Sequence, residues 1–294
     1  MNKTLHRNDD RTIGILSVLI IVSAISATAV GIYSEKGPGP YTYTSIRGET
    51  ITVYGEGIYQ HMSEEVALQG IAQDYFTLFA ALPLLAVVSV VFRKCLSGQI
   101  IRTGVFAYLF IQYLFYLLMA MYSALFLLYV VLTGTTFFAF LLSLRSVDVS
   151  ALFTKNSLRF PRRYIGTVLL INASTITLLW LSVVLPPLLD GSIYPPQVEH
   201  YTTLIVQGMD LSLLLPLAAV SALLLLRKKP SGYLYASVYT VFLSLQMLAL
   251  SAKIAAMGLA GYSIIPVIFI IPGFFLVSFI GTVKIILAFR QKKD

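Results

Sequence analysis

Long apolar segments dominate the hydrophobic pattern of the chain. Windows of about 19 residues, the length suited to detecting membrane-spanning helices, predict eight spans. About 20 apolar residues in a helix cross roughly 30 Å of hydrocarbon, so each segment is long enough to span a bilayer. The predicted spans are 12–33, 73–92, 103–121, 124–144, 164–187, 204–226, 232–257 and 263–287. The pattern therefore predicts an all-α membrane protein with a polytopic bundle of eight transmembrane helices.

The third and fourth predicted spans are almost continuous in sequence. A single helix over 103–144 would be about twice as long as the membrane is thick. We therefore place a turn between them at Met121, Tyr122 and Ser123.

The distribution of basic residues predicts the orientation. With the amino terminus inside, all Lys and Arg residues except Lys36, Arg47 and Lys253 fall on the inner side or at the inner ends of spans. Cytoplasmic loops carry an excess of these residues, so both termini are expected in the cytoplasm of a cell-membrane protein. The inner set is Lys3, Arg7, Arg11, Arg93, Lys94, Arg102, Arg145, Lys155, Arg159, Arg162, Arg163, Arg227, Lys228, Lys229, Lys284, Arg290, Lys292 and Lys293.

The first span has a second interpretation. A basic start precedes its apolar stretch, and Ala27-Thr28-Ala29 fits the cleavage site of a secretory signal peptide. A true span is favoured by its length and by Ser23, Ala27 and Gly31, which form a stripe of small residues suited to helix packing.

The one long segment between spans is the outer loop 34–72. Alternating β-branched and aromatic residues at 41–46 and 50–54 flank Arg47-Gly48-Glu49, a pattern that predicts a β-hairpin. Ser63 is then expected to cap a helix whose first turn contains Glu64 and Glu65. The sequence predicts a small outer β-hairpin cap.

The two halves share a weak internal repeat. Asp74 precedes Leu82-Pro83-Leu84 and Arg93-Lys94, while Asp210 precedes Leu215-Pro216-Leu217 and Arg227-Lys228. A 4+4 parallel repeat, as in some transporters, would divide the single integral membrane domain 1–294 into halves 1–150 and 151–294. Short apolar and basic matches also arise by chance.

Four segments resemble uncharacterised multi-pass membrane proteins of bacteria. They are Gln69–Asp74, Met121–Val130, Thr202–Pro216 and Leu248–Ile254. The resemblance implies a membrane protein and assigns no activity or ligand.

Few ionisable residues lie within the spans, and apart from Lys284 near the inner end of the last span they fall at one depth. At 1.5 Å per residue, Asp74, Asp210 and Lys253 stand about 25 to 32 Å from the inner surface. Buried charges are costly and mark functional sites. We expect an outward-facing ligand-binding cavity in which the aspartates and Lys253 are joined by Gln73 and Gln207. The alternative is that these charges simply face headgroup water.

Other polar residues have more modest interpretations. Gln112, Gln246 and Asn172 are expected to form hydrogen bonds between helices. The weak candidates for a metal site just outside the membrane are His61, Glu64, Glu199 and His200, and no metal or other cofactor is predicted.

Composition narrows the function classes. Hydrophobic residues make up 57% and charged residues 12% of the chain, whereas soluble domains have about 45 to 50% and about 25%. The net charge of +8 comes from short clusters between spans and predicts no nucleic-acid partner. The single Cys95 allows no intrachain disulfide. No catalytic or nucleotide-binding motif is present, so an enzyme is less expected.

Three functions remain open. The first is a transporter-like protein with an outward-facing polar cavity for a small molecule or ion. The second is a membrane-embedded enzyme acting at the outer leaflet, and the third is a non-catalytic membrane subunit or sensor. The lipid bilayer is the one partner that all three require.

Overall fold

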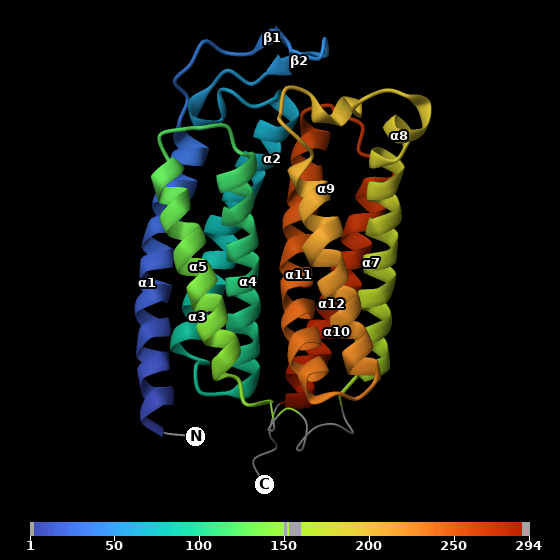
Figure 1. Cartoon of the computed structure of the whole chain (residues 1–294). Coiled ribbons are helices and arrows are strands. Elements are labelled where there is room, and N and C mark those ends of the chain that lie inside the picture. The colour runs from blue at the N-terminus through green and yellow to red at the C-terminus, as the bar shows by residue number, and fades with distance from the viewer. Residues whose placement is uncertain (1–2, 150–151, 153–159, 290–294) are drawn as a thin grey trace.

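The computed structural model of the chain describes residues 3–149, 152 and 160–289. Within these residues, eight helices are long and apolar enough to cross a membrane, as predicted. They stand side by side in an upright bundle, and a small two-stranded sheet covers one end (Figure 1). The fold is that of an all-α polytopic protein.

The eight spans fall into two groups of four along the chain. The first group and its connections comprise α1 (Lys3–Tyr33), β1 (Tyr41–Thr44), β2 (Thr50–Val53), η1 (Gly57–Tyr59), α2 (Glu64–Phe76), η2 (Thr77–Ala81), α3 (Leu82–Val90), α4 (Leu96–Met119) and α5 (Phe126–Ser146). The second comprises α7 (Arg162–Val184), α8 (Pro186–Asp190), η3 (Pro196–Val198), α9 (Ile205–Met209), η4 (Asp210–Leu214), α10 (Leu215–Leu226), α11 (Pro230–Leu259) and α12 (Val267–Phe289). The predicted turn at 121–123 is confirmed, because α4 ends before it and α5 begins after it.

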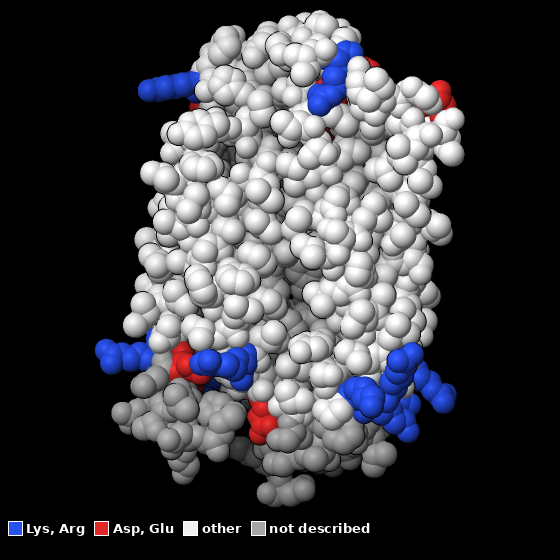
Figure 2. All heavy atoms as spheres, viewed as in Figure 1, with Lys and Arg blue, Asp and Glu red and all other residues white. Residues whose placement is uncertain are grey.

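The two ends of the bundle differ in charge. Helix α1 begins and α12 ends at the same end (Figure 1), which we call the basic end because exposed Arg93-Lys94 and Arg227–Lys229 follow α3 and α10 there. A broad surface without charged side chains separates the charged residues of the two ends (Figure 2). This band is the surface expected to face lipid. The cytoplasmic position of the basic end stays a prediction, and Lys155, Arg159, Arg290, Lys292 and Lys293 lie outside the described residues.

The opposite end carries the predicted hairpin, and we call it the cap end. Strands β1 and β2 pair antiparallel as predicted. Arg47, in the turn between them, reaches the connection between the fifth and sixth spans and donates to the carbonyls of Tyr201 at 2.8 Å and Thr202 at 3.3 Å. The hydroxyl of Tyr194 donates back to the carbonyl of Arg47 at 2.7 Å. The hairpin of the first half is therefore fastened to the second half.

The second span begins earlier than its apolar window predicted. Helix α2 starts at Glu64 rather than near residue 73, so the loop at the cap end is 34–63. Polar residues such as Glu64, Glu65 and Gln69 lower the hydropathy of the first turns without interrupting the helix. Ser63 occupies the N-cap position as expected, but its hydroxyl makes no capping hydrogen bond.

The second and the sixth spans, which both run from the cap end to the basic end, widen at corresponding points. The backbone N–H of Leu82 bonds to the carbonyl of Thr77, and that of Leu215 bonds to the carbonyl of Asp210, each five residues back. Pro83 and Pro216 follow directly. Proline lacks an N–H and its ring collides with the carbonyl four residues back, so a π turn relieves the clash. When the two halves are aligned on these π turns, Asp210 corresponds to Thr77 and not to Asp74.

Polar side chains join the central helices. Gln112 of α4 donates to Gln246 of α11 at 2.6 Å, which confirms the predicted bond between helices. The amide nitrogen of Asn172 has no hydrogen-bond partner among the described residues, so the bond expected from this group is not found.

Candidate functional site

Asp74 lies deep in the first half, within a group of tyrosines. Its side chain is buried, and its two carboxylate oxygens accept hydrogen bonds from the hydroxyls of Tyr59 and Tyr116. The bond from Tyr116 is 2.9 Å long. Tyr59 comes from η1, in the loop at the cap end, and Tyr116 from α4. Two elements thus supply the donors that a buried carboxylate requires.

Local packing fixes this carboxylate. Gly31 of α1 faces it so closely that a Cβ atom added at residue 31 would collide with the Asp74 carboxylate and lie 3.1 Å from the Tyr59 hydroxyl. Burial first, and then the charge of Asp74, hold the pKa of Tyr59 well above its usual range. Tyr59 therefore stays protonated and serves as a hydrogen-bond donor at neutral pH.

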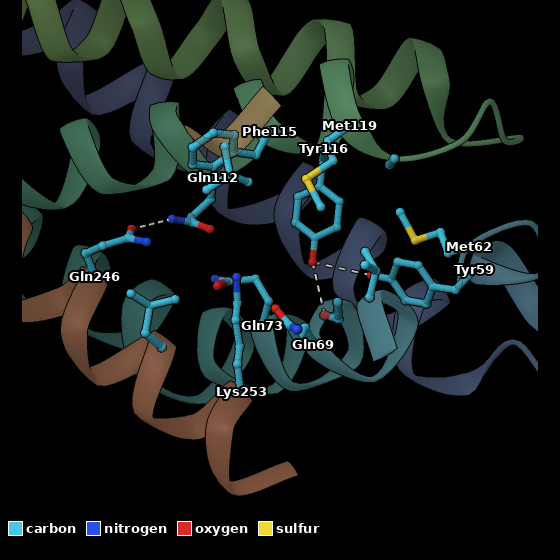
Figure 3. A pocket seen from close by; sticks show the side chains of 15 residues that line it. Tyr59, Met62, Gln69, Gln73, Gln112, Phe115, Tyr116, Met119, Gln246 and Lys253 are labelled. Carbon is cyan, nitrogen blue, oxygen red and sulfur yellow. Dashed lines mark hydrogen bonds between the residues drawn. The ribbon is translucent and has the colours of Figure 1, made fainter. Parts of the chain in front are cut away.

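A pocket lined by both polar and apolar side chains lies beside this tyrosine group, where α2, α4, α9 and α11 approach one another. Its volume is about 130 Å³. Figure 3 shows Gln73 of α2, Gln112 of α4, and Gln246 and Lys253 of α11 among the side chains around it. We call it the Lys253 pocket. Asp74 does not line it, because Tyr59 and Tyr116 stand between the carboxylate and the cavity.

Lys253 supplies the one charged side chain in the lining of this pocket. Its side chain extends from α11 into the cavity (Figure 3). Among the residues that the structure describes, its ammonium makes no ion pair and no hydrogen bond, and it interacts electrostatically with Asp74 across a longer distance. Although Lys253 and the two aspartates were expected to share one cavity, Lys253 is not paired directly with Asp74 or Asp210 in the described part of the chain. A half-buried ammonium without close partners is suited to bind an anionic or strongly polar group.

A second cavity adjoins Lys253 and is lined mainly by residues of the second half, together with Glu65 and Gln69 of α2. It has a volume of about 380 Å³, and we call it the Trp180 cavity. Trp180 of α7 donates its indole N–H to the carboxylate of Asp210 at 2.7 Å, and both line the cavity. Gln69, Gln246 and Lys253 belong to the linings of both cavities. Lys253 is thus placed between the Asp74 side and the Asp210 side of the bundle.

Two buried side-chain amides in these walls each have one polar atom without a hydrogen-bond partner among the described residues. Gln73 is 1% exposed; its amide nitrogen donates to the hydroxyls of Tyr108 and Thr77, but its carbonyl oxygen is unpaired among the described residues. Asn172 is 2% exposed, and its unpaired amide nitrogen belongs to the wall of the Trp180 cavity. Unpaired buried polar groups are costly, so their presence at cavity walls favours a missing polar partner.

The structure brings some of the expected site residues together and separates others. Lys253 and Gln73 share the Lys253 pocket, whereas Asp74 lies behind it and Asp210 lines the neighbouring cavity. Gln207 lies on α9, one turn before Asp210, but Val206 supplies the contact of α9 with the pocket.

Two of the expected metal candidates form side-chain hydrogen bonds elsewhere. The ring of His200 bonds to the carbonyl of His61 at 2.8 Å, and Glu64 accepts a hydrogen bond from Tyr262 at 3.0 Å. No cluster of three His, Cys, Asp or Glu side chains that could hold a metal ion occurs in the described part of the chain.

Sequence reasoning missed the aromatic partners of the aspartates. Tyr59, Tyr116 and Trp180 were not singled out, although each bonds directly to a carboxylate. Trp180 is the sole tryptophan of the chain, and it falls at nearly the depth of the charged layer. That shared depth was the one feature of the sequence that could have indicated a contact between Trp180 and an aspartate.

Fold and site together define a multi-pass helical membrane protein with polar cavities between its halves, near the cap end. No protein-family model, no curated protein and no solved structure matches the chain.

Proposed function

We propose that this chain is a transporter-like integral membrane protein that binds a small polar molecule or ion at Lys253, between two four-span halves. The observation that carries the proposal is the position of Lys253 in the walls of both the Lys253 pocket and the Trp180 cavity, without a close counter-ion among the described residues. A bound solute would supply the missing partner. Asp74 and Asp210, on opposite sides, would balance the charge as the solute moves.

We further propose that the halves are parallel repeats. The π turns before Pro83 and Pro216 support this, as do Gly98 and Gly232, each packed tightly against the end of the preceding helix. Gln112 and Gln246 occupy corresponding positions, 134 residues apart, and bond to each other. Related halves that meet at a central binding site are a recurring design in transporters that work by alternating access.

The cap end is proposed to face outward, with both termini in the cytoplasm. The excess of Lys and Arg at the basic end supports this orientation. The binding site would then open toward the outside of a cell membrane.

Binding is tested first by thermal unfolding of the purified full chain with a panel of inorganic anions, carboxylates, phosphate esters and amino acids. A ligand at a hundred times its Kd stabilises the folded state by about 2.7 kcal/mol. We expect a stabilising compound whose effect is lost in Lys253→Met and kept in Lys284→Met. Equal stabilisation of both variants would contradict the proposed site.

Transport is tested with the stabilising compound in proteoliposomes. Uptake should be abolished when Asp74 and Asp210 are both changed to Asn, because solute movement would no longer be charge-compensated. Unchanged uptake in the double variant would exclude the aspartates from the mechanism. Binding without uptake would favour a membrane-embedded receptor.

A further inference from the structure

A third cavity opens lower in the same gap between the halves. Its volume is about 420 Å³, and we call it the apolar groove. Phe110 and Phe140 form one side, Leu213 and Leu217 form the other, and Val238 and Phe242 of α11 form the base. No charged residue lines it. It lies in the uncharged band, where the space-filling surface is hollowed between the halves (Figure 2).

The apolar groove and the Lys253 pocket are stacked along the same helices. On α4, Ile111 lines the groove and the adjacent Gln112 lines the pocket. On α11, Phe242 lines the groove and Gln246, one turn further, lines the pocket. The gap between the halves is therefore polar toward the cap end and apolar toward the middle of the membrane.

Depth and charge match one class of ligand. Phe242 lies eleven residues before Lys253 on α11, about 16 Å along the helix, and one leaflet of hydrocarbon is about 15 Å thick. The pocket is lined by one cation and no carboxylate. The bonded amides of Gln112 and Gln246 lie at the level between the cavities, where a lipid carries its ester groups. The groove is open to lipid, since Leu213 is 55% and Leu217 48% exposed.

We propose that the ligand is an anionic lipid drawn from the membrane leaflet at the cap end. Its charged headgroup lies against Lys253, and its hydrocarbon chain lies in the apolar groove. This inference rests on the proposed function: it keeps the binding site at Lys253 and identifies the polar group bound there as the headgroup of a lipid rather than a free solute. Entry through the side of the bundle follows from it, because the groove faces the bilayer.

The test uses the full chain in nanodiscs and 1-palmitoyl lysophosphatidylglycerol with a diazirine in its acyl chain. Light fixes the bound probe, and peptide mass spectrometry measures labelling of α10 and α4. We expect labelling to fall at least tenfold in Lys253→Met and in Leu217→Trp, which fills the groove. The matched controls are Lys284→Met and Leu223→Trp, an exposed position on α10 outside the groove; both should label like wild type. Thermal unfolding verifies that each variant is folded.

Three outcomes would overturn the inference. Labelling that is insensitive to both Lys253→Met and Leu217→Trp would exclude the lipid site, whereas the proposed function is tested separately by the thermal-unfolding panel on Lys253→Met. Equal labelling by the matched lysophosphatidylcholine probe would exclude recognition of negative charge. In the third outcome, glycerol 3-phosphate competes as strongly as the unlabelled lipid and Leu217→Trp does not change labelling. This result would exclude a binding site for the hydrocarbon chain in the apolar groove and leave a polar solute site at Lys253.

Discussion

At the scale of single residues, the arrangement around Asp74 depends on the smallest side chain in contact with it. Gly31 leaves just enough room for the carboxylate and for the Tyr59 hydroxyl that bonds to it. A stripe of small residues through Gly31 was predicted to support helix packing. The structure shows that this position also makes room for a buried polar group.

Gly31→Ala should therefore destabilise the protein by about 1 to 3 kcal/mol, the usual range for overpacking a tight site. The added methyl group would displace the Asp74 carboxylate from its two donors. Thermal unfolding in detergent measures the effect. Gly14→Ala is the matched control, because nothing lies within 4 Å of a Cβ atom at that position of the same helix. Equal unfolding temperatures for the two variants would contradict this account of Asp74.

Whether the position of a site residue could be predicted depends on how far away in sequence its partners lie. Lys253 and Gln73 were predicted because helix rise and hydropathy set depth along a span, and depth is a local property. The partners of Asp74 and Asp210 come from elements 15, 42 and 30 residues away in sequence, so they depend on tertiary packing. No periodicity within one segment carries that information.

At the scale of secondary-structure elements, the side-chain hydrogen bond from Gln112 to Gln246 joins α4 and α11. Gln112→Leu should cost about 1 kcal/mol, since hydrogen bonds between membrane helices average about 0.6 and reach about 1.7 kcal/mol. The remaining Gln246 amide would be buried without its partner. The double variant Gln112→Leu with Gln246→Leu should cost less than the sum of the single changes. Thermal unfolding of the two single variants and the double variant measures these losses of stability. If the loss in the double variant equals the sum of the single losses, the two side chains act independently.

The hairpin also makes a specific contact across the halves. Arg47→Gln should loosen it from the connection that follows η3, because the guanidinium bonds to the carbonyls of Tyr201 and Thr202 would be lost. A loss of about 1 to 2 kcal/mol in the local stability of the hairpin makes its opening roughly 5 to 30 times more frequent. Hydrogen exchange at residues 41–53 should accelerate accordingly. Lys36→Gln, in the same loop, serves as control, and equal exchange in both variants would exclude a fastening role for Arg47.

The elements were predicted more fully than their junctions. Hydropathy located all eight spans, and β-branched alternation located the hairpin. The start of α2 was predicted too late in the sequence, because hydropathy windows detect the membrane-embedded part of a helix rather than its end. A proline inside a helix favours a kink but does not specify how the backbone relieves its clash, so the π turns that begin at Thr77 and Asp210 were not foreseen.

At the scale of the whole molecule, the orientation of the bundle determines what the site can reach. Cys95 is the single cysteine of the chain and is exposed at the basic end. An impermeant maleimide should therefore label it in inside-out vesicles and leave it unlabelled in right-side-out vesicles. Cys95→Ser combined with Lys36→Cys moves the thiol to the cap end and should reverse the pattern. Labelling of Cys95 from the outside would invert the proposed topology.

The central claim is that Lys253 lines a water-accessible chamber open toward the cap end, and accessibility of this position tests it most directly. In right-side-out vesicles, a chain with Cys95→Ser and Lys253→Cys is treated with an impermeant, positively charged methanethiosulfonate. The chain with Cys95→Ser alone gives the background reaction. The chain with Cys95→Ser and Lys284→Cys places the thiol near the basic end, which the reagent should not reach in right-side-out vesicles. We predict reaction at residue 253 and none at residue 284. Protection of residue 253 in right-side-out vesicles, with reaction at that residue confined to inside-out vesicles, would contradict the account.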